Sequence, residues 1–157
     1  MKPIELSADA FREYGQLIHD LSDEKLTTDF SHVKYWKKIT EFSLPSVVST
    51  SYLIGRKRNF VVTEMERHFN TNEVIIPLDN DAILVVAKPD AKTESPVDVT
   101  AFYLRRSQGV VLHQNIWHVV PFPINADESA YFILFAKGTE ENDLHFHVMG
   151  KIYRIEV

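Results

Sequence analysis

The middle of the chain reads Val74-Ile75-Ile76-Pro77-Leu78, then Asp79-Asn80-Asp81, then Ala82-Ile83-Leu84-Val85-Val86-Ala87. Both outer segments are apolar and rich in β-branched residues, which favours buried β-strands. The three polar residues between them are typical of a turn. This stretch therefore predicts two strands joined by a short connection.

Similar short runs recur on either side of this pair, separated by turn-forming residues. Nine runs can be distinguished: Val47–Ile54, Phe60–Met65, Val74–Leu78, Ala82–Ala87, Val97–Leu104, Gly109–Leu112, Trp117–Phe122, Tyr131–Ala136 and Ile152–Val157. Their regular spacing, without helical stretches between them, favours a sandwich or small barrel over a parallel sheet with crossover helices. We therefore expect a mostly β fold in which residues 47–157 form an antiparallel, two-sheet barrel.

One short helix is expected near the N-terminus. Ser7 can cap it, Ala8–Tyr14 can form it and Gly15 can end it. Phe11 and Tyr14 share one face, so we expect the helix to pack on the outside of the barrel.

Two polar segments predict loops, Asp20–Asp29 and Pro89–Pro96. Neither resembles a linker between domains. With 157 residues, the chain has a common size for one domain, and we expect residues 1–157 to form a single domain.

The composition excludes several classes of function. The net charge is −5 and no basic block is present. We therefore expect a small-molecule substrate and no nucleic-acid partner. Without cysteine the chain has no disulfide, thiolate metal site or thiol nucleophile, and any metal needs His and carboxylate ligands. The sequence has no signal-like apolar run and no stretch approaching the ~20 apolar residues of a membrane span, so we expect a cytoplasmic protein without a membrane partner.

The first candidate for chemistry is the segment Thr63–His68. Strand alternation places Glu64, Glu66 and His68 on one face. If that face points into a barrel, these groups are desolvated and must be paired, protonated or bound to metal. If it faces solvent, they form an ordinary polar edge. Periodicity alone favours the solvent alternative.

The second candidate is the segment Gly109–Pro123, which carries His113, Trp117 and His118. Histidine can serve as a general base near neutral pH or as a metal ligand. The alternative is that both are core histidines bonded to the backbone. A further pair, His145 and His147, is predicted to lie on the exposed side of an edge strand and outside the site.

Together the two segments resemble the paired motifs of the cupin barrels. Glu66-x-His68, four residues and Glu73 stand in place of the first motif, and His113 stands in place of the histidine of the second. Three features differ from the cupin pattern: Glu66 replaces a first histidine, no glycine closes the first motif, and three residues rather than two separate Gly109 from His113.

A more extensive resemblance is to the ureidoglycolate lyase family, also called ureidoglycolate hydrolases. It rests on Glu64-x-Glu66-Arg67-His68, on Ile76-Pro77-Leu78, and on Gln108-Gly109 followed by His113, Asn115, Trp117 and His118. The family more often carries glutamine where this chain has Glu73. The resemblance implies a cupin-like barrel, usually a homodimer, that splits ureidoglycolate into glyoxylate and urea during allantoin and purine breakdown.

These resemblances suggest roles for individual residues. We expect catalytic roles for Glu66, His68, His113 and His118, substrate binding by Arg56, Arg67, Trp117 and Lys137, and one divalent metal ion of undetermined identity held by His68, Glu73 and His113. Two alternatives stay open: a non-catalytic cupin that binds a small carboxylate, and a different metal-dependent lyase or isomerase.

Overall fold

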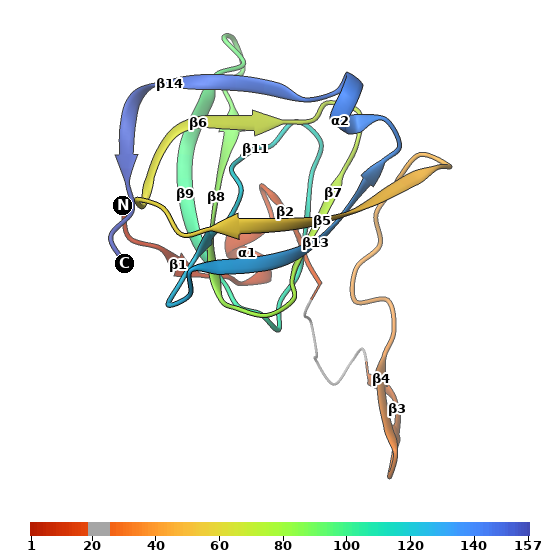
Figure 1. Cartoon of the computed structure of the whole chain (residues 1–157). Coiled ribbons are helices and arrows are strands. Elements are labelled where there is room, and N and C mark those ends of the chain that lie inside the picture. Colours follow the sequence, from red (N-terminus) through yellow and green to blue (C-terminus); the bar gives the residue numbers. More distant parts are fainter. Residues whose placement is uncertain (19–25) are drawn as a thin grey trace.

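The computed structural model describes residues 1–18 and 26–157, which form two facing β-sheets (Figure 1). The first has seven strands: β1 (Ile4–Glu5), β9 (Pro96–Leu104), β8 (Ala82–Pro89), β11 (Trp117–His118), β6 (Val61–Arg67) and β14 (His145–Arg154) in that order, with β12 (Phe122–Pro123) beside β8. The second has five: β2 (Gly15–Leu17), β10 (Val110–Leu112), β7 (Glu73–Pro77), β13 (Glu128–Ala136) and β5 (Val48–Arg56). The β1–β9 pairing is parallel, and every other pairing among the described strands is antiparallel. The predicted antiparallel, two-sheet architecture is confirmed.

The core lies between the two sheets, as strand alternation requires. Alternate residues of β8, such as Leu84 and Val86, pack with Ile133 of β13 and Leu112 of β10, and all four are buried. β7 and β8 occupy different sheets, although they follow one another in the sequence. The Asp79-Asn80-Asp81 turn therefore connects the two sheets and does not join two paired strands of a hairpin.

The N-terminal helix is shorter than predicted. α1 spans Ala8–Phe11, and Ser7 caps it by accepting a hydrogen bond from the backbone N–H of Ala10. Gly15 does not end the helix but begins β2, and a Cβ at Gly15 would clash with the carbonyl oxygen of Val111. Residues 8–10 are exposed and Phe11 is buried, so the helix packs on the outside of the barrel through one face, as predicted.

Aromatic packing explains the position of this segment. Phe11 and Tyr14 are buried and contact Phe102 edge-on, at ring-centroid distances of 5.2 and 5.7 Å. Burying these rings removes a large apolar area from water, so one face of the segment packs into the core while Arg12 and Glu13 stay exposed.

The remaining elements are a two-stranded sheet and a second short helix. β3 (Leu26–Phe30) pairs with β4 (Val33–Trp36), and α2 spans Thr139–Asn142. The prediction of a loop over Asp20–Asp29 is therefore wrong from Leu26 onward, and residues 20–25 lie outside the described residues. None of the described helices is long and apolar enough to cross a membrane.

Candidate active site

Three titratable side chains meet at one end of the core: His68, Glu73 and His118. His68 follows β6, Glu73 begins β7 and His118 ends β11, so both sheets contribute. Glu73 Oε2 lies 2.9 Å from His118 Nε2 and 3.3 Å from His68 Nε2. All three residues are buried, at 3 to 7% exposure. One carboxylate thus stands between two imidazole rings in a region from which water is largely excluded.

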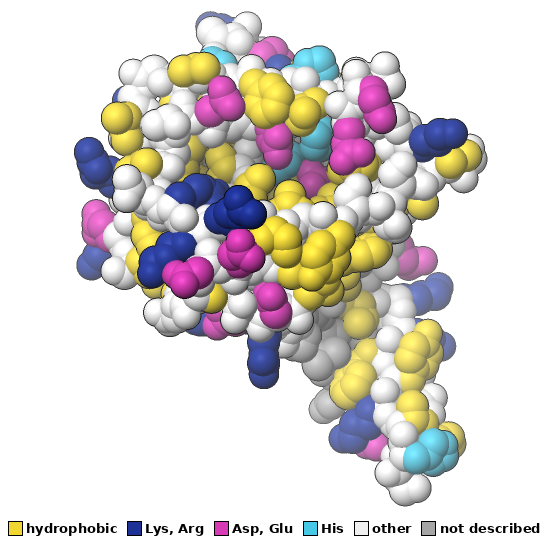
Figure 2. Space-filling model, viewed as in Figure 1, with side chains coloured by type: hydrophobic (Ala, Val, Ile, Leu, Met, Phe, Trp, Pro, Cys, Tyr) yellow, Lys and Arg dark blue, Asp and Glu magenta, His cyan; other side chains and the backbone are white. Residues whose placement is uncertain are grey.

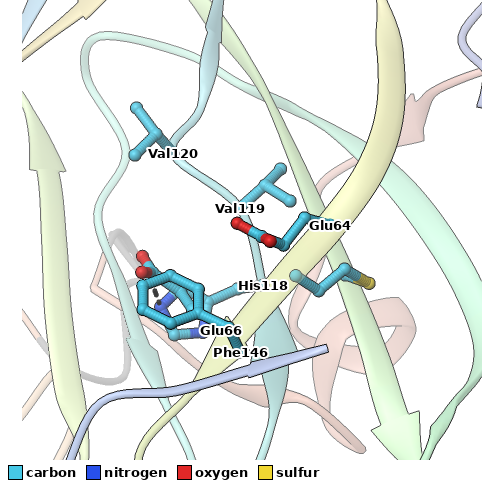
Figure 3. Close-up of a pocket in the computed structure, with 7 residues that line it drawn as sticks. Glu64, Glu66, His118, Val119, Val120 and Phe146 are labelled. Atoms are coloured by element: carbon cyan, nitrogen blue, oxygen red, sulfur yellow. Dashed lines mark ion pairs between the residues drawn. The ribbon is translucent and has the colours of Figure 1, made fainter. Parts of the chain in front are cut away.

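Strand register places Glu66 beside this cluster. His118 pairs with Glu66 of β6 on one side and with Val86 of β8 on the other. Residues directly opposite one another on neighbouring strands point to the same face of a sheet. Because Val86 belongs to the core between the sheets, His118 and Glu66 also point inward. Glu66 Oε1 lies 3.7 Å from His118 Nε2, and its side chain keeps 24% exposure (Figure 3).

Backbone carbonyls hold both imidazole rings in place. His68 Nδ1 lies 2.8 Å from the carbonyl oxygen of Asp143, and His118 Nδ1 lies 3.0 Å from that of Ile116. A carbonyl oxygen only accepts hydrogen bonds, so each Nδ1 carries a hydrogen and donates it. The Nε2 atoms therefore face Glu73. There each Nε2 can carry a second proton or offer a lone pair.

The charges in this cluster stabilise one another. Burial opposes the charging of His118, but the nearby negative charges of Glu73 and Glu66 outweigh it and raise the pKa of His118 to about 9. Burial likewise opposes the charging of Glu73, and the two histidines nevertheless lower the pKa of Glu73 to about 2. Burial also disfavours the charged form of His68, yet Glu73 raises the pKa of His68 above its ordinary value. Near neutral pH these shifts favour a carboxylate beside protonated imidazole.

The cluster also fits a divalent metal ion. One ligand atom from each of His68, Glu73 and His118 can be chosen so that all three lie within 4.8 Å of one another. Despite their 2.9 Å separation, Glu73 Oε2 and His118 Nε2 are not angled for a hydrogen bond, and both atoms are buried without a hydrogen-bond partner. We therefore attribute the pKa shifts of this pair to charge rather than to a directed bond. Two imidazole nitrogens and a carboxylate oxygen suit a divalent transition metal.

A groove along the inner face of β6 connects the cluster to solvent. One pocket, of about 160 Å³, is lined by Glu64, Met65, Glu66, His118, Val119, Val120 and Phe146 (Figure 3). A second, of about 260 Å³, is lined by Ser51, Tyr52, Leu53, Glu66, His68, Glu73, Ile133, Phe135, Glu140 and Leu144. Because both share Glu66, we treat them as one feature and call it the β6 groove. Figure 2 shows acidic and histidine side chains gathered in this hollow between β6 and β5.

The strand face that carries Glu64, Glu66 and His68 was expected either to point into the barrel or to face solvent. Each alternative describes part of this face. Glu64 is exposed, Glu66 is partly exposed and His68 is buried. The face therefore runs from solvent into the protein interior, which places a partly solvated carboxylate beside a desolvated imidazole.

His118, and not His113, completes the buried cluster. His113 is exposed and is not part of the group of ligand atoms formed by the described residues. It lines a small pocket together with His68, Glu73 and His118, but it is not within ligand distance of a metal position shared with them. Leu112 points into the core, so alternation turns the next side chain outward. Among the described residues, the candidate metal group therefore contains His118 where the sequence predicted His113.

The residues expected to bind substrate lie away from the β6 groove, because none of them lines either pocket. Arg56 is 81% exposed in its side chain and pairs with Glu128 at 3.0 Å. Lys137 is exposed at the end of β13, and its backbone N–H bonds to the carbonyl oxygen of Val47. Neither cation therefore lies in the β6 groove.

Arg67 and Trp117 form a separate buried assembly. The guanidinium of Arg67 lies 4.2 Å from the ring centre of Trp117 and donates to Glu94 at 2.8 Å and to Asn115 at 2.7 Å. The indole N–H of Trp117 donates to the carbonyl oxygen of Glu94. Arg67 alternates with Glu66 and His68, and Trp117 with His118, so both point to the opposite face. Their contacts tie the loop between β8 and β9 to the sheet.

Two residues of the site are missing from the sequence prediction. The carboxylate of Asp143 accepts hydrogen bonds from the backbone N–H groups of Phe69 and Asn70, while its carbonyl oxygen orients His68. Glu140 of α2 lines the β6 groove. Both lie in a polar segment that has the composition of a solvated turn, so the sequence offers no signal for either role.

Solved structures similar to this one support the cupin-like fold. A 3,4-ketoisomerase from Helicobacter canadensis matches with a TM-score of 0.54 and 13% identity over 83% of this chain and 88% of that chain. The sugar 3,4-ketoisomerase QdtA from Thermoanaerobacterium thermosaccharolyticum matches with a TM-score of 0.52 and 15% identity over 82% of this chain and 85% of that chain. At these identities the likeness concerns the fold alone.

Sequence relatives identify the family more closely. Ureidoglycolate lyase 2 of Rhizobium meliloti is 33% identical over 59% of this chain and 55% of its own length, and ureidoglycolate lyase of Brucella ovis is 35% identical over 59% and 53%. The chain thus spans about half the length of these curated relatives. Ureidoglycolate lyase of Stutzerimonas stutzeri is 30% identical over 72% and 69%. The ureidoglycolate lyase family model matches residues 1–156, and the chain therefore belongs to the ureidoglycolate lyase family.

Proposed function

We propose that this protein is a lyase that splits ureidoglycolate into glyoxylate and urea, and that the β6 groove is its active site. One observation carries the proposal: a chain of this family buries His68, Glu73 and His118 against a carboxylate, Glu66, that solvent can reach. Perturbed titratable groups in a pocket are typical of acid–base catalysis.

The chemistry of the substrate calls for these groups. Ureidoglycolate carries a hydroxyl, a ureido nitrogen and a carboxylate on one carbon. Loss of the hydroxyl proton lets the oxygen form the carbonyl of glyoxylate while the carbon–nitrogen bond breaks. The nitrogen must gain a proton to leave as urea. One base near the hydroxyl and one acid near the nitrogen are therefore needed.

Glu66 and His118 can supply the two proton transfers. Glu66 is open to the groove and takes the hydroxyl proton, while His118 Nε2–H donates to the ureido nitrogen. Glu73 keeps His118 charged before the reaction, because its carboxylate raises the pKa of His118 to about 9. The 3.7 Å separation of Glu66 and His118 then lets the proton on Glu66 return to His118.

We also propose that the cluster can bind one divalent metal ion. His68, Glu73 and His118 would hold it in place of the Nε2 proton of His118, and when bound it would stabilise negative charge that develops on a substrate oxygen. In that state Glu66 would carry the hydroxyl proton to the ureido nitrogen. Metal binding requires both Nε2 atoms to be unprotonated. Protons and metal therefore compete for the same atoms of the chain, and we expect metal affinity to fall steeply with decreasing pH.

Metal titration tests this competition directly. Apo-protein exposed to zinc, manganese or nickel near pH 8 should retain one equivalent of one of these ions after gel filtration, and its melting temperature should rise. His68→Ala should abolish both effects, whereas His145→Ala should leave them unchanged, because His145 lies outside the cluster and pairs with Asp143. Equal metal retention by the wild-type protein and His68→Ala would contradict the assignment.

Turnover tests the reaction and the role of Glu66. Purified wild-type protein, assayed with and without added divalent metal, should release urea and glyoxylate in equal amounts. Glu66→Gln should lower kcat by about 10²-fold or more, because the amide cannot accept the hydroxyl proton. Glu141→Gln, in the polar α2 segment, is the matched control and should retain wild-type kcat. If the wild-type protein binds glyoxylate but turns over no ureidoglycolate, the non-catalytic carboxylate-binding alternative is correct.

The setting of the reaction is also a proposal. The family resemblance supports a cytoplasmic homodimer that acts in allantoin and purine breakdown, and the shared core supports one domain over residues 1–157. Sedimentation of the purified protein at micromolar concentration tests the dimer.

A further inference from the structure

The β6 groove continues past Glu64 into a third pocket that contains an arginine. This pocket, of about 340 Å³, is lined by Arg58, Asn59, Val61, Val62, Thr63, Glu64, Val119 and Phe122. It shares Glu64 and Val119 with the pocket that contains Glu66 and His118. Arg58 belongs to the connection between β5 and β6. A cation thus lies at the end of a groove whose other charged residues are acids and histidines.

Arg58 is held by backbone carbonyls rather than by an acid. Nη1 donates to the carbonyl oxygens of Arg56 and Pro121 at 3.2 and 3.3 Å, and Nη2 donates to that of Val120. The guanidinium carbon lies 3.8 Å from the ring centre of Phe122, which fixes the plane of the group. These contacts orient the guanidinium without neutralising its charge.

The remaining donors of Arg58 are available to a ligand. A guanidinium has five N–H groups, and the bonds to carbonyls use three of them. The Nε–H and one Nη2–H have no partner among the described residues. Glu64 lines the same pocket but forms no ion pair with Arg58 in the described part of the chain. Arg58 is exposed as a residue, although partial burial of its guanidinium lowers its pKa and the Tyr131 hydroxyl opposes this. An anion bound here would pair with a charge that no acid among the described residues neutralises.

We propose that Arg58 binds the carboxylate of the substrate at this end of the groove. The proposal rests on the proposed function and adds the orientation of the substrate: its carboxylate faces Arg58, its reacting carbon lies beside Glu66 and His118, and its ureido group extends toward the pocket that contains Ser51 and Glu140. Arginine binds carboxylates through two parallel N–H bonds, which fix orientation as well as affinity. The Val120 carbonyl that holds Arg58 belongs to a residue that also lines the pocket with His118, and the two pockets share Glu64 and Val119.

Product binding tests the subsite separately from turnover. The probes are glyoxylate, which carries the carboxylate, and urea, which does not. Arg58→Gln should weaken glyoxylate binding to the metal-free protein by about tenfold or more, as expected for loss of a charge-assisted pair. Inhibition of ureidoglycolate turnover by urea should stay unchanged. The matched control is Arg56→Gln, because Arg56 is exposed and already paired with Glu128; this variant should bind glyoxylate like the wild-type protein.

Each outcome separates the subsite from its alternatives. Arg58→Gln should raise KM for ureidoglycolate with a smaller change in kcat, because Arg58 positions the substrate and transfers no proton. If Arg58→Gln folds poorly, Arg58→Lys is the second variant, because it keeps the charge but loses the paired donors. Its loss of glyoxylate affinity should be smaller than the loss expected for Arg58→Gln. Unchanged glyoxylate affinity in both Arg58 variants would overturn the proposal, as would failure of the wild-type protein to bind glyoxylate. Glyoxylate binding that depends on Arg58 without any turnover would support the subsite and refute the lyase.

Discussion

His118→Ala is expected to lower kcat/KM for ureidoglycolate by about 10²- to 10⁴-fold, the range for loss of a general acid. His118 Nε2 faces both Glu73, at 2.9 Å, and Glu66, at 3.7 Å, and it is the protonated group nearest the base. Without it, the leaving nitrogen has no positioned proton donor and Glu66 loses its partner. Steady-state assays of urea release measure the loss.

The matched control is His113→Ala. Both histidines lie in the segment shared with the ureidoglycolate lyases, yet His113 is exposed and stands outside the buried cluster. We expect His113→Ala to retain most of the wild-type kcat/KM. Since His118 is buried, His118→Gln and a melting curve for each variant separate chemistry from folding. Equal losses of activity in folded His113→Ala and His118→Ala would place the acid elsewhere.

Glu73→Gln is expected to change how stability depends on pH. The folded pKa of His118, about 9, lies above its ordinary value of 6.5, so this interaction stabilises the fold fully below 6.5 and is lost as the pH rises through 9. The folded pKa of Glu73, about 2, lies below its ordinary value of 4.5, so its contribution is full above 4.5 and is lost as the pH falls through 2. The two contributions are both complete only between pH 4.5 and 6.5.

Urea unfolding of the wild-type protein and Glu73→Gln, with a chelator present, measures this effect. Within that pH window the substitution should lower the free energy of unfolding by about 3 kcal/mol, because it breaks a buried charge pair. Above pH 9 the difference should shrink, since His118 is then neutral in both proteins. Glu64→Gln is the control, because Glu64 is exposed on the same strand, and it should leave the pH dependence unchanged. A difference between the wild-type protein and Glu73→Gln that stays constant from pH 4.5 to 10 would exclude the charge pair as its cause.

Local pattern was sufficient to predict most of the strands. Eight of the nine apolar runs overlap strands within a few residues, because β-branched and aromatic runs bounded by turn-forming residues favour extended backbone. The C-terminal run, Ile152–Val157, covers only the end of β14. This strand begins at His145, where it forms the predicted edge of the first sheet. Edge strands alternate less clearly, since solvent reaches both of their faces.

The sequence by itself determined which strand faces carry the chemistry, but not which groups from different strands meet. Alternation within β6 placed Glu66 and His68 together, and the spacing to Glu73 pointed to the same site. The choice of His118 over His113 depends on strand pairing, which sets His118 opposite Glu66. The orientation of Arg58 in its pocket depends on the distant carbonyls of Val120 and Pro121. Contacts between residues far apart in sequence follow from register and core packing, so only the tertiary structure decided them.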